Sequence, residues 1–403
     1  MSNPINVFSE IGKLKSVLIH RPGLELENLT PDLLERLLFD EIPYQKVAAE
    51  EHDAFKAHLE DNGVEVLYIE ELVAKTLDEN PQWRDDFINR FIKEAKISKK
   101  YREKYRAFIT KKKNLDMVKT MIAGTKKFDL KIKNTNDDPF ITEPLPNILF
   151  QRDPFASIGN GATIHKMWAE TRNRETLFCD FVLRDNSRFA NQITFYYTRK
   201  DRHTIEGGDI MVLNKTTLVI GMSQRTEMKA IKKVTKRIFK DPKATFEKIV
   251  ILDLPKARAF MHLDTVFTNI DYDKFIVHPL IFDYIDQFKI WEITKDDGKK
   301  RVKKNLQVYL EELVGKKVKL IKCGGDDEIA AGREQWNDGT NVITLSPGKV
   351  IAYERNYVTI ELLKKAGVKV LTIPSSELSR GRGGPRCMSM PLVREELENN
   401  RKE

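Results

Sequence analysis

Residues 59–72 read LEDNGVEVLYIEEL, and residues 363–378 read LKKAGVKVLTIPSSEL. In both stretches the end of an amphipathic helix is followed by a glycine, where helices commonly stop, and then by a strand of alternating Val, Leu and Ile. Weaker copies occur in ATFEKIVILDLP (244–255) and LEELVGKKVKLIKCGG (310–325). The pattern predicts one helix-to-strand unit that is used several times along the chain.

A second kind of strand precedes these units. Short apolar runs that end in polar or charged residues occur in KSVLIHRPG (15–23), TTLVIGMSQRT (216–226), DKFIVHPLIF (273–282) and GKVIAYERN (348–356). A repeated strand, helix and returning strand indicates an α/β architecture with radial or stacked pseudo-symmetry, and a plain run of parallel βαβ units is the alternative. In a radial arrangement the polar strand ends converge near the axis, and we expect a functional site there.

Residues 73–138 interrupt this rhythm. The stretches ENPQWRDDFINRFIKEAK and KKYREKYRAFITKK have the spacing of amphipathic helices, and no strand pattern is convincing there. We therefore predict a main α/β domain formed by residues 1–72 and 139–403, with an all-helical domain of residues 73–138 inserted into it. The polar, proline-containing stretch at 133–147 leads back into the main domain.

The composition is typical of a chain that can bury a large core, with 403 residues of which 41% are apolar. No run of eighteen apolar residues is present, which excludes a membrane-spanning helix, and the first residues lack the apolar centre of a signal peptide. The three cysteines are odd in number and widely spaced, so we expect a cytoplasmic protein with free thiols. The net charge of +9 is compatible with binding anions or nucleic acid but indicates neither.

Common cofactor and hydrolase motifs are missing from the sequence. It contains no GxGxxG after a strand, no GxxxxGK[ST], no HExxH and no GxSxG. Nucleotide cofactors, zinc proteolysis and the common serine hydrolase mechanism therefore have no support, and we expect neither a metal nor an organic cofactor.

Four segments place acidic or reactive side chains beside glycine or a turn: FQRDPFASIGNG (150–161), HTIEGGDIMVL (203–213), MHLDTVFTNID (261–271) and RGRGGPRCMSMP (380–391). A cysteine nucleophile needs a base or a positive field to become a thiolate. Cys387 is the candidate nucleophile, His262 is its candidate partner, and Arg382 and Arg386 are candidate sources of positive charge. The other cysteines, Cys179 and Cys323, are interpreted as inert thiols.

Three carboxylates in these segments, Asp153, Glu206 and Asp264, would repel a thiolate. Their presence is explained if the substrate is a cation that sits between them, and a guanidinium is the natural partner because its N–H donors pair bidentately with carboxylates. A cysteine protease or transglutaminase would use a similar Cys/His/acid set. Those enzymes attack a neutral amide, however, and have no need for several carboxylates around the bond that breaks.

The quoted segments, together with IGKLKSVLIHRPGLELENLTP near the N-terminus and LLFDEIPY, resemble the arginine deiminase family along essentially the whole chain. The resemblance implies a five-bladed α/β propeller of ββαβ repeats with an inserted all-helical domain. It also implies hydrolysis of free L-arginine to L-citrulline and ammonia through a covalent amidino-cysteine intermediate. A homodimer or higher oligomer is plausible for such a protein.

The resemblance further implies a role for each matching position. Cys387 is the nucleophile and His262 the general acid/base, Glu206 supports the histidine and holds the guanidinium, and Asp153 and Asp264 grip its nitrogens; Arg172 and Arg225 bind the α-carboxylate, Asn147 and Phe150 line the pocket, and Arg382 gates it. Two positions depart from the family pattern: Gln151 replaces an expected Thr, and Arg386 precedes the nucleophile, where it is able to shift the thiol's pKa.

Two rival functions remain at this stage. A related enzyme acting on agmatine or methylated arginine, or transferring an amidino group, would use a similar site, but Arg172 and Arg225 argue against agmatine because it has no α-carboxylate. A nucleic-acid-binding protein is suggested by the net charge and by RGRGG (380–384). RGG segments that bind nucleic acid usually occur as repeats interleaved with aromatic residues. This chain has one copy without an aromatic, so we expect no nucleic acid partner.

Overall fold

The computed structural model describes residues 3–134, 138–279 and 289–397. Five sheets share one pattern, in which an antiparallel pair is followed by a third strand parallel to the second. Their strands are β19 (Met390–Arg394), β1 (Leu14–Ile19) and β2 (Glu65–Tyr68); β5 (Phe155–Ile158), β6 (Gly161–Ile164) and β7 (Thr194–Tyr197); β8 (Ile210–Asn214), β9 (Thr217–Met222) and β10 (Lys248–Asp253); β11 (Phe267–Asn269), β12 (Lys274–Val277) and β15 (Lys319–Lys322); β16 (Ile343–Ser346), β17 (Lys349–Tyr353) and β18 (Lys369–Ile373). The mixed α/β class predicted from the sequence is confirmed, and the antiparallel pairs exclude a plain run of parallel βαβ units.

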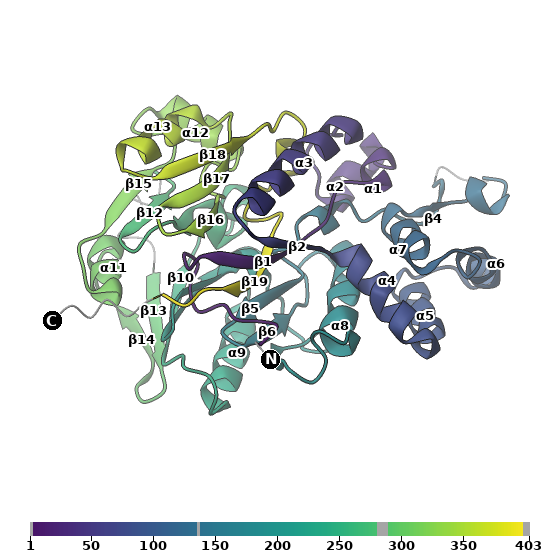
Figure 1. Cartoon of the computed structure of the whole chain (residues 1–403), viewed down its shortest axis with the longest axis horizontal. Coiled ribbons are helices and arrows are strands. Elements are labelled where there is room, and N and C mark those ends of the chain that lie inside the picture. Colours follow the sequence, from purple (N-terminus) through teal and green to yellow (C-terminus); the bar gives the residue numbers. More distant parts are fainter. Residues whose placement is uncertain (1–2, 135–137, 280–288, 398–403) are drawn as a thin grey trace.

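A helix joins the two parallel strands of each sheet. These helices are α3 (Gln45–Asp61), α8 (Glu175–Asp185), α9 (Met228–Lys240), α11 (Leu306–Val314) and α13 (Tyr357–Lys365), and they lie at the periphery around the strands in Figure 1. Because parallel strands need a crossover, a helix of this length is the ordinary connection. The first sheet contains strands from both ends of the sequence, because β1 pairs with β19 in antiparallel orientation.

The two stretches that open the sequence analysis fold as predicted. Helix α3 ends at Asp61 and helix α13 ends at Lys365, and the glycines that follow, Gly63 and Gly367, have φ values of +72° and +81°. This left-handed conformation is costly for other residues, so glycine allows the chain to leave the helix and enter the strand. Strands β2 and β18 follow directly.

The main body also contains a β-hairpin and several short helices outside the pattern of the five sheets. Strands β13 (Lys289–Thr294) and β14 (Gly298–Val302) form a hairpin that extends the β8–β10 sheet, because β13 is antiparallel to β10. Of the predicted strand at 273–282, residues 280–282 lie outside the described residues. The short helices are α1 (Leu24–Glu27), α2 (Leu34–Leu37), α12 (Glu328–Trp336), η1 (Pro31–Leu33), η2 (Pro81–Trp83), η3 (Phe128–Leu130), η4 (Pro146–Leu149), η5 (Glu170–Arg174), η6 (Gly207–Asp209), η7 (Arg258–Phe260), η8 (Leu263–Thr265) and η9 (Leu378–Gly381).

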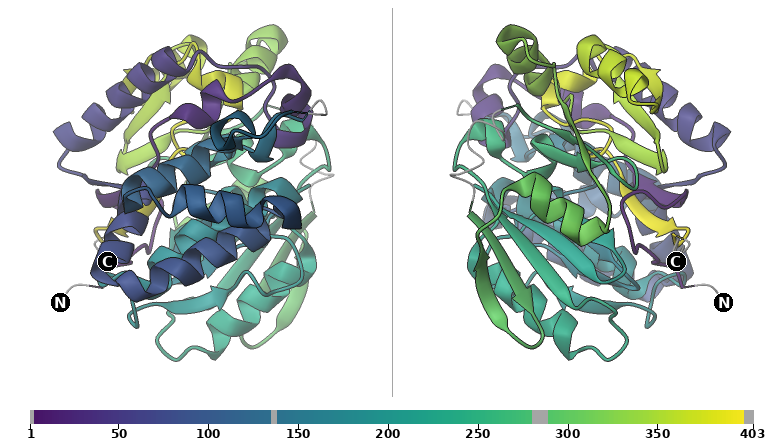
Figure 2. Two further views of the ribbon diagram at one scale, coloured as in Figure 1. Left: turned by 90° about the vertical axis from the view of Figure 1, so that its right-hand side faces the viewer. Right: turned by 90° about the vertical axis from the view of Figure 1, so that its left-hand side faces the viewer.

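Four helices form the segment that interrupts the repeat: α4 (Ile69–Glu79), α5 (Arg84–Glu94), α6 (Lys99–Ile109) and α7 (Asn114–Ala123). They project to the right in Figure 1 and face the viewer in the left view of Figure 2. Helix α4 begins before residue 73, so it crosses the predicted boundary. The short strands β3 (Thr125–Lys126) and β4 (Phe140–Thr142) then lead back to the sheets.

The helical segment shares its core with the sheets. The ring of Phe87 on α5 lies 4.7 Å from that of Phe181 on α8, measured between centroids, and Phe91 packs against Phe178 of the same helix. All four rings are buried. Burial of such aromatic pairs fixes the segment against the main body.

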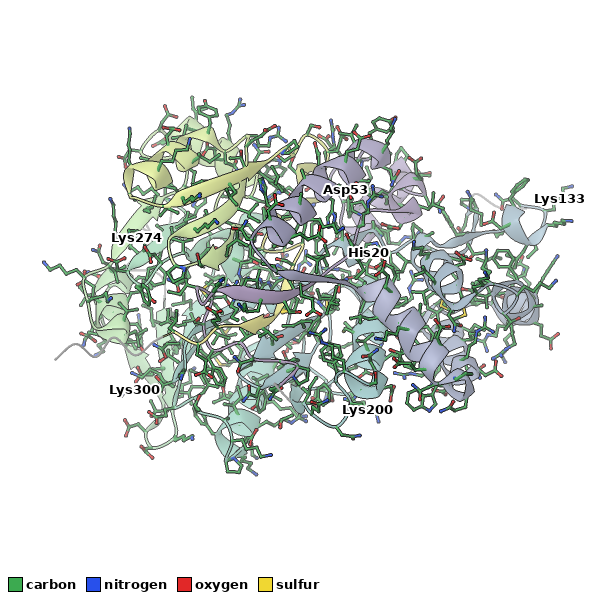
Figure 3. The ribbon with its side chains drawn as sticks, in the orientation of Figure 1. His20, Asp53, Lys133, Lys200, Lys274 and Lys300 are labelled. Atoms are coloured by element: carbon green, nitrogen blue, oxygen red, sulfur yellow. The ribbon has the colours of Figure 1, made fainter. Side chains whose placement is uncertain are left out.

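The surface is charged on all sides. Figure 3 shows the labelled Lys133, Lys200, Lys274 and Lys300 at separate edges of the molecule. No helix among the described residues has the length and apolar character that crossing a membrane requires.

Candidate active site

The chemically reactive side chains come from turns that immediately precede the first strand of a sheet. Asp153 precedes β5, Glu206 precedes β8, His262 and Asp264 precede β11, and Cys387 precedes β19. Arg225, by contrast, follows β9 at one of the polar strand ends where the sequence predicted a site. Four of the five sheets therefore deliver residues to one place.

Asp153, Arg225, His262 and Cys387 line a cavity of about 30 Å³. Glu206 and Asp264 are not part of its wall, but they form hydrogen bonds with His262 and Cys387, respectively. The walls of the cavity comprise Leu38, Asn147, Phe150, Asp153, Arg172, Arg225, Arg258, Met261, His262, Thr265, Gly381, Arg382 and Cys387. The sequence had singled out Asn147, Phe150, Arg172, Arg225 and Arg382 in addition to the reactive groups. A space of this size holds about one water molecule, so the site is closed in this conformation.

Cys387 lies at the cavity wall, and both its backbone and its thiol form hydrogen bonds. Its backbone N–H donates to Oδ1 of Asn341 at 2.9 Å, and its thiol donates to Oδ2 of Asp264 at 3.6 Å. Burial raises the pKa of the Cys387 thiol well above its usual value, and Asp264 and Asp153 add to the rise while Arg386 opposes it. The thiol is therefore protonated in this state.

A glycine permits the approach of the cysteine loop to Asn341. A Cβ atom at Gly384 would lie 2.4 Å from the backbone oxygen of Asn341, which is closer than real Cβ atoms come. That oxygen accepts the backbone N–H of Arg386. Glycine at position 384 is thus needed for close packing of the loop that carries the thiol.

His262 is buried between two carboxylates. Its Nε2 donates to Oε2 of Glu206 at 2.7 Å, and its Nδ1 lies 3.8 Å from Oδ1 of Asp153. Burial alone would lower the pKa of His262, but Asp153 and the hydrogen bond to Glu206 raise it to about 9. The imidazole is therefore protonated at neutral pH and can donate a proton.

Glu206 remains ionised although it is fully buried. Burial favours its neutral form, but Arg225, His262 and Arg172 together hold the pKa of Glu206 far below its usual value. The carboxylate also accepts the backbone N–H of Trp168 at 2.9 Å. A fixed negative charge thus lies directly beside His262.

The two aspartates differ in how much of their hydrogen-bonding capacity is used. Asp153 accepts the backbone N–H of Gly208 at 3.2 Å through Oδ1 and the Nη1–H of Arg172 at 2.9 Å through Oδ2. Asp264 accepts the Nη1–H of Arg386 at 2.7 Å through Oδ2, whereas its Oδ1 is buried without a hydrogen-bond partner among the described residues. A buried carboxylate oxygen without a partner is costly, and a donor brought into the site would satisfy it.

Both candidate carboxylate-binding arginines reach the cavity. Arg172 donates to Asp153 and also to Glu175 at 2.9 Å. Arg225 places Nη1 3.5 Å from Oε2 of Glu206, and its guanidinium lies over the ring of Trp168, 4.8 Å from the centroid. The Nε of Arg225 has no hydrogen-bond partner among the described residues, so it has a donor to spare.

The remaining residues predicted for the site, Asn147, Phe150 and Arg382, also line the cavity. Asn147 donates to the carbonyl oxygen of Leu37 at 2.5 Å, and the ring of Phe150 lies 6.4 Å from that of Phe39. Arg382 has a left-handed backbone (φ +60°), and its guanidinium lies 3.5 Å from the ring centroid of Trp336.

The two departures from the family pattern point away from the cavity. Arg386 is fully buried and also contacts Glu10, with its Nε 3.3 Å from Oε2. Gln151 donates to the carbonyl oxygen of Ile148 at 2.7 Å. Arg386 thus acts on the site through Asp264, and Gln151 has a structural contact only.

Several neighbours of the site were missed by the sequence analysis, namely Trp168, Arg258, Met261, Thr265 and Asn341. Met261 and Thr265 belong to MHLDTVFTNID, and Arg258 lies three residues before it, so proximity in sequence was the available signal for these three. Trp168 and Asn341 lie in no motif, and only tertiary structure brings them to the site.

Asp153, Glu206 and His262 also satisfy the geometry of a metal site, since one ligand atom of each lies within 4.8 Å of the others. A guanidinium already occupies their neighbourhood: Nη1 of Arg172 is 2.9 Å from Asp153 and 3.9 Å from Glu206. The cluster therefore accommodates a planar organic cation.

Known proteins resemble this chain over nearly its whole length. The family model for arginine deiminase matches residues 35–394. The arginine deiminase of Mycoplasma capricolum is 63% identical over 400 residues, covering 99% of both chains, and that of Clostridium perfringens is 48% identical over 410 residues, covering 98% of both.

Solved structures with low sequence identity share the fold. An amidinotransferase from Microseira wollei has a TM-score of 0.58 at 15% identity, covering 98% of both chains. A dimethylarginine dimethylaminohydrolase has a TM-score of 0.53 at 16% identity, covering 94% of this chain and 99% of its own.

Proposed function

The chain belongs to the arginine deiminase family, and we propose that it hydrolyses free L-arginine to L-citrulline and ammonia. The observation that carries the proposal is a cavity lined by Cys387, the protonated His262 and Asp153, with the carboxylates of Glu206 and Asp264 hydrogen-bonded to the histidine and to the thiol. A substrate carrying a guanidinium satisfies the carboxylates, and its central carbon then faces the thiol. The site needs no group beyond these side chains for the chemistry below.

Substrate binding places the guanidinium between Asp153 and Asp264. The unpartnered Oδ1 of Asp264 accepts one N–H, and Asp153 accepts another when it exchanges the guanidinium of Arg172 for that of the substrate. Both contacts are charge-assisted hydrogen bonds, which are short and strong. The cavity is too small for arginine as it stands, so Arg382 and the loop that carries it move away to admit the substrate.

The bound cation also activates the nucleophile. Without substrate, burial and the neighbouring aspartates keep the Cys387 thiol protonated. A positive charge placed against these aspartates offsets their repulsion of the thiolate, and so lowers the thiol's pKa. Because His262 is already protonated, the thiol proton leaves to solvent. The nucleophile is thus formed mainly when its target is in place.

The reaction proceeds in two halves. The Cys387 thiolate attacks the guanidinium carbon, the carbon–nitrogen bond breaks, and His262 donates a proton to the departing ammonia. This leaves an amidino-thioether on Cys387 and a neutral His262. His262 then removes a proton from water, the resulting hydroxide attacks the same carbon, and the carbon–sulfur bond breaks to release citrulline and the thiolate.

Glu206 and the arginines support these steps. The hydrogen bond from His262 to Glu206 fixes the imidazole and stabilises its protonated form. Arg225, whose Nε is unpartnered, binds the α-carboxylate together with Arg172. Asn147 and Phe150 line the channel for the aliphatic chain and amino group.

We also propose that the five sheets are the blades of an α/β propeller and that residues 73–138 are an inserted all-helical domain. Their shared order of one antiparallel and one parallel pair supports this description. The prediction of a homodimer or higher oligomer can be checked by sedimentation equilibrium.

The test compares substrates on the purified enzyme. Turnover of L-arginine with equimolar citrulline and ammonia is expected, and agmatine should be turned over far more slowly because it lacks the group that Arg225 binds. Dimethylarginine should also be poor, because its methyl groups occupy nitrogens that the aspartates grip. A clear preference for agmatine or dimethylarginine would replace this proposal by that of a sister enzyme.

A further inference from the structure

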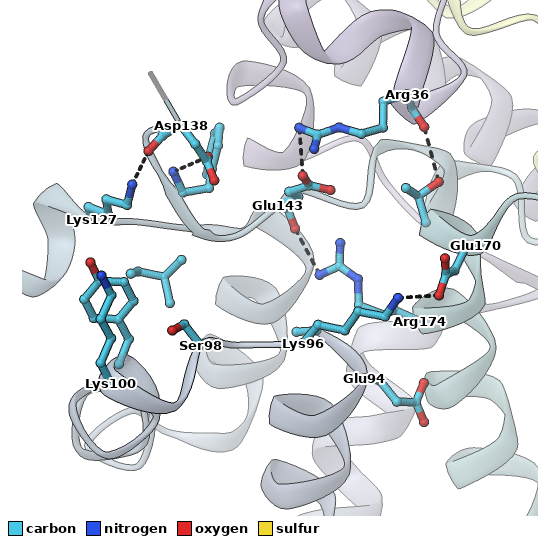
Figure 4. Close-up of a pocket in the computed structure, with 15 residues that line it drawn as sticks. Arg36, Glu94, Lys96, Ser98, Lys100, Lys127, Asp138, Glu143, Glu170 and Arg174 are labelled. Carbon is cyan, nitrogen blue, oxygen red and sulfur yellow. Dashed lines mark hydrogen bonds and ion pairs between the residues drawn. The ribbon is translucent and has the colours of Figure 1, made fainter. Parts of the chain in front are cut away.

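A second, larger cleft of about 770 Å³ lies between the helical segment and the main body (Figure 4). It is lined by residues from α2, the end of α5, the α5–α6 connection, the start of α6, residues 127 and 138–143, and η5. Clefts that bind small molecules commonly have volumes of this order, roughly 300–1,000 Å³. The proposed reaction makes no use of this cleft.

The acidic groups that line this cleft are largely neutralised. Glu143 pairs with Arg36 at 2.8 Å, Glu170 pairs with Lys96, and Glu94 pairs with Arg199, which lies outside the lining. Asp138 also lines the cleft, and its Oδ1 accepts the backbone N–H of Phe140 at 3.0 Å. Within the described residues, Arg174 and Lys100 form no ion pair with a carboxylate.

Arg174 is a buried cation with unused donors. Its side chain is 93% buried, and its one hydrogen bond within the described residues goes from Nη1 to the carbonyl oxygen of Glu143 at 3.2 Å. Figure 4 shows the guanidinium directed toward Glu143 and into the cleft. Burial lowers the pKa of Arg174, although Glu143 and Tyr105 oppose the shift. A buried guanidinium with free N–H groups is a strong receptor for an anion.

The first turn of α6 faces the same cleft. Ser98 occupies the position before the helix but makes no side-chain capping bond, and the turn contains no acidic residue. Instead it carries Lys99 and Lys100, whose charges are unfavourable at the positive end of a helix. The Nζ of Lys100 lies 4.7 Å from the ring centroid of Tyr101, and Lys100 forms no ion pair with another described residue. Free backbone N–H groups, a serine hydroxyl and lysines at a helix start are features of phosphate sites.

We propose that this cleft binds a phosphate-bearing small metabolite, with the phosphate held by Arg174, Lys100 and the N-terminus of α6. The cleft is larger than a phosphate ion and has room for the organic part of a metabolite. Inorganic phosphate and a phosphate ester offer the same group, and the experiment below separates them.

Occupancy of this cleft is coupled to the catalytic cavity through η5. This short helix of five residues carries Glu170, Thr171 and Arg174 at the cleft and Arg172 at the catalytic cavity. The hydroxyl of Thr171 donates to the carbonyl oxygen of Arg36, two residues before Leu38 of the catalytic wall. An anion that draws Arg174 toward the cleft shifts η5, and with it the contact between Arg172 and Asp153. This part of the inference rests on the proposed function, whereas anion binding does not.

The binding test is isothermal titration of the full chain with inorganic phosphate and, separately, with adenosine monophosphate, in the absence of arginine. Saturable binding is expected, with Kd raised about tenfold or more in Arg174→Gln and in Lys100→Gln, because each removes a charge-assisted contact. Lys300→Gln is the matched control, since Lys300 is exposed and lies at the edge of the molecule opposite the helical segment (Figure 3). If Arg174→Gln does not fold, the exposed Lys100 decides the matter alone.

The outcomes are distinct. Tighter binding of adenosine monophosphate than of phosphate identifies an ester as the ligand, and the reverse order identifies the free ion. The proposal is overturned if no saturable binding is measured. It is also overturned if wild type and all variants bind with equal affinity, because the anion would then be bound elsewhere, for instance at Arg172 and Arg225. The coupling is tested by the KM for arginine, which should change when phosphate or adenosine monophosphate is added to the wild-type protein but not when it is added to Lys100→Gln. An unchanged KM despite binding overturns the coupling, and a protein without deiminase activity still permits the binding test.

Discussion

Two buried histidines in this molecule lie between pairs of carboxylates, and only one of them is placed for catalysis. His20 follows β1, and its Nδ1 lies 2.8 Å from Glu70 while its Nε2 lies 3.1 Å from Glu25. Burial favours neutral His20, but the two carboxylates raise its pKa to about 10. His262 has the same kind of surroundings and a pKa raised to about 9.

The difference between the two clusters lies in what surrounds them. His262 shares its cavity with Cys387, whose thiol donates to Asp264. The other oxygen of Asp264 has no hydrogen-bond partner among the described residues. His20 borders a wider cleft, of about 1,130 Å³, in which no cysteine appears among the described lining residues. It joins the end of β1 to the first turn of α4 through Glu70, and so fastens the helical segment to the first sheet. A raised pKa therefore marks burial among carboxylates, whereas a nucleophile and an unsatisfied acceptor mark the catalytic cluster.

The largest expected effect is at the cysteine. Cys387→Ser should lower kcat by about 10⁴-fold or more. The bound cation is sufficient to remove the proton from the thiol, whereas the serine hydroxyl keeps its proton and remains a poor nucleophile. Cys323→Ala is the matched control, since Cys323 is also buried and burial raises its pKa to about 12. Citrulline formation per folded molecule measures both. If both variants lost the same share of activity, the result would contradict the assignment of Cys387 alone as the nucleophile.

The two histidines should respond in opposite ways. His262→Gln should lower kcat by about 10²–10⁴-fold, the usual contribution of a general acid/base. His20→Gln should leave kcat nearly unchanged but lower the free energy of unfolding by about 3 kcal/mol, because it leaves Glu25 and Glu70 as buried charges without their partner. Urea unfolding and turnover are measured on both variants. A loss of kcat in folded His20→Gln would show that the second cluster also serves catalysis.

A smaller effect is expected at the substrate carboxylate. Arg225→Ala should raise the KM for arginine by about 10–100-fold with a lesser change in kcat, since the contact exists in ground and transition states alike. Agmatine, which has no carboxylate, should be affected much less. An unchanged KM for arginine would assign Arg225 to another role.

The smallest effects concern pH, and they separate the clusters by sign. Deprotonation of His262 removes the proton for ammonia, so kcat/KM should fall as pH rises through about 9. His20 has a higher pKa folded than unfolded, so its contribution to stability is complete below pH 6.5 and is lost as pH rises through about 10. The stability difference between wild type and His20→Gln should therefore shrink over this range. A difference that grows with pH would contradict the assigned charge of His20.

Much of the site could be predicted from local sequence. MHLD, RDPF and RGRGGPRC each contain a residue that lines the cavity, and EGGD contains Glu206, which accepts a hydrogen bond from His262. Each motif includes the turn that orients its side chain. The fold class followed from helix, glycine and strand patterns around Gly63 and Gly367, where local geometry dictates the residue. Local signals were sufficient for these features.

Long-range contacts could not be predicted in this way. The hydrogen bond from His20 to Glu70 joins residues 50 apart, and Asn341 reaches the cysteine loop from 46 residues away. The exchange expected at Asp153 also depends on the contact with Arg172, which the sequence assigned only to the substrate's carboxylate. Each of these depends on how separate elements pack, and no single stretch of sequence encodes it.

The most direct measurement of the central claim follows the guanidino carbon of arginine during turnover. The enzyme is mixed with L-arginine labelled at that carbon and quenched in acid at a series of times, and the label is located by peptide mass spectrometry. The account predicts label on the peptide that contains Cys387, with the mass of arginine less ammonia, and none in Cys387→Ser. Label on Cys179 or Cys323, or citrulline formed at the wild-type rate by Cys387→Ser, would contradict it.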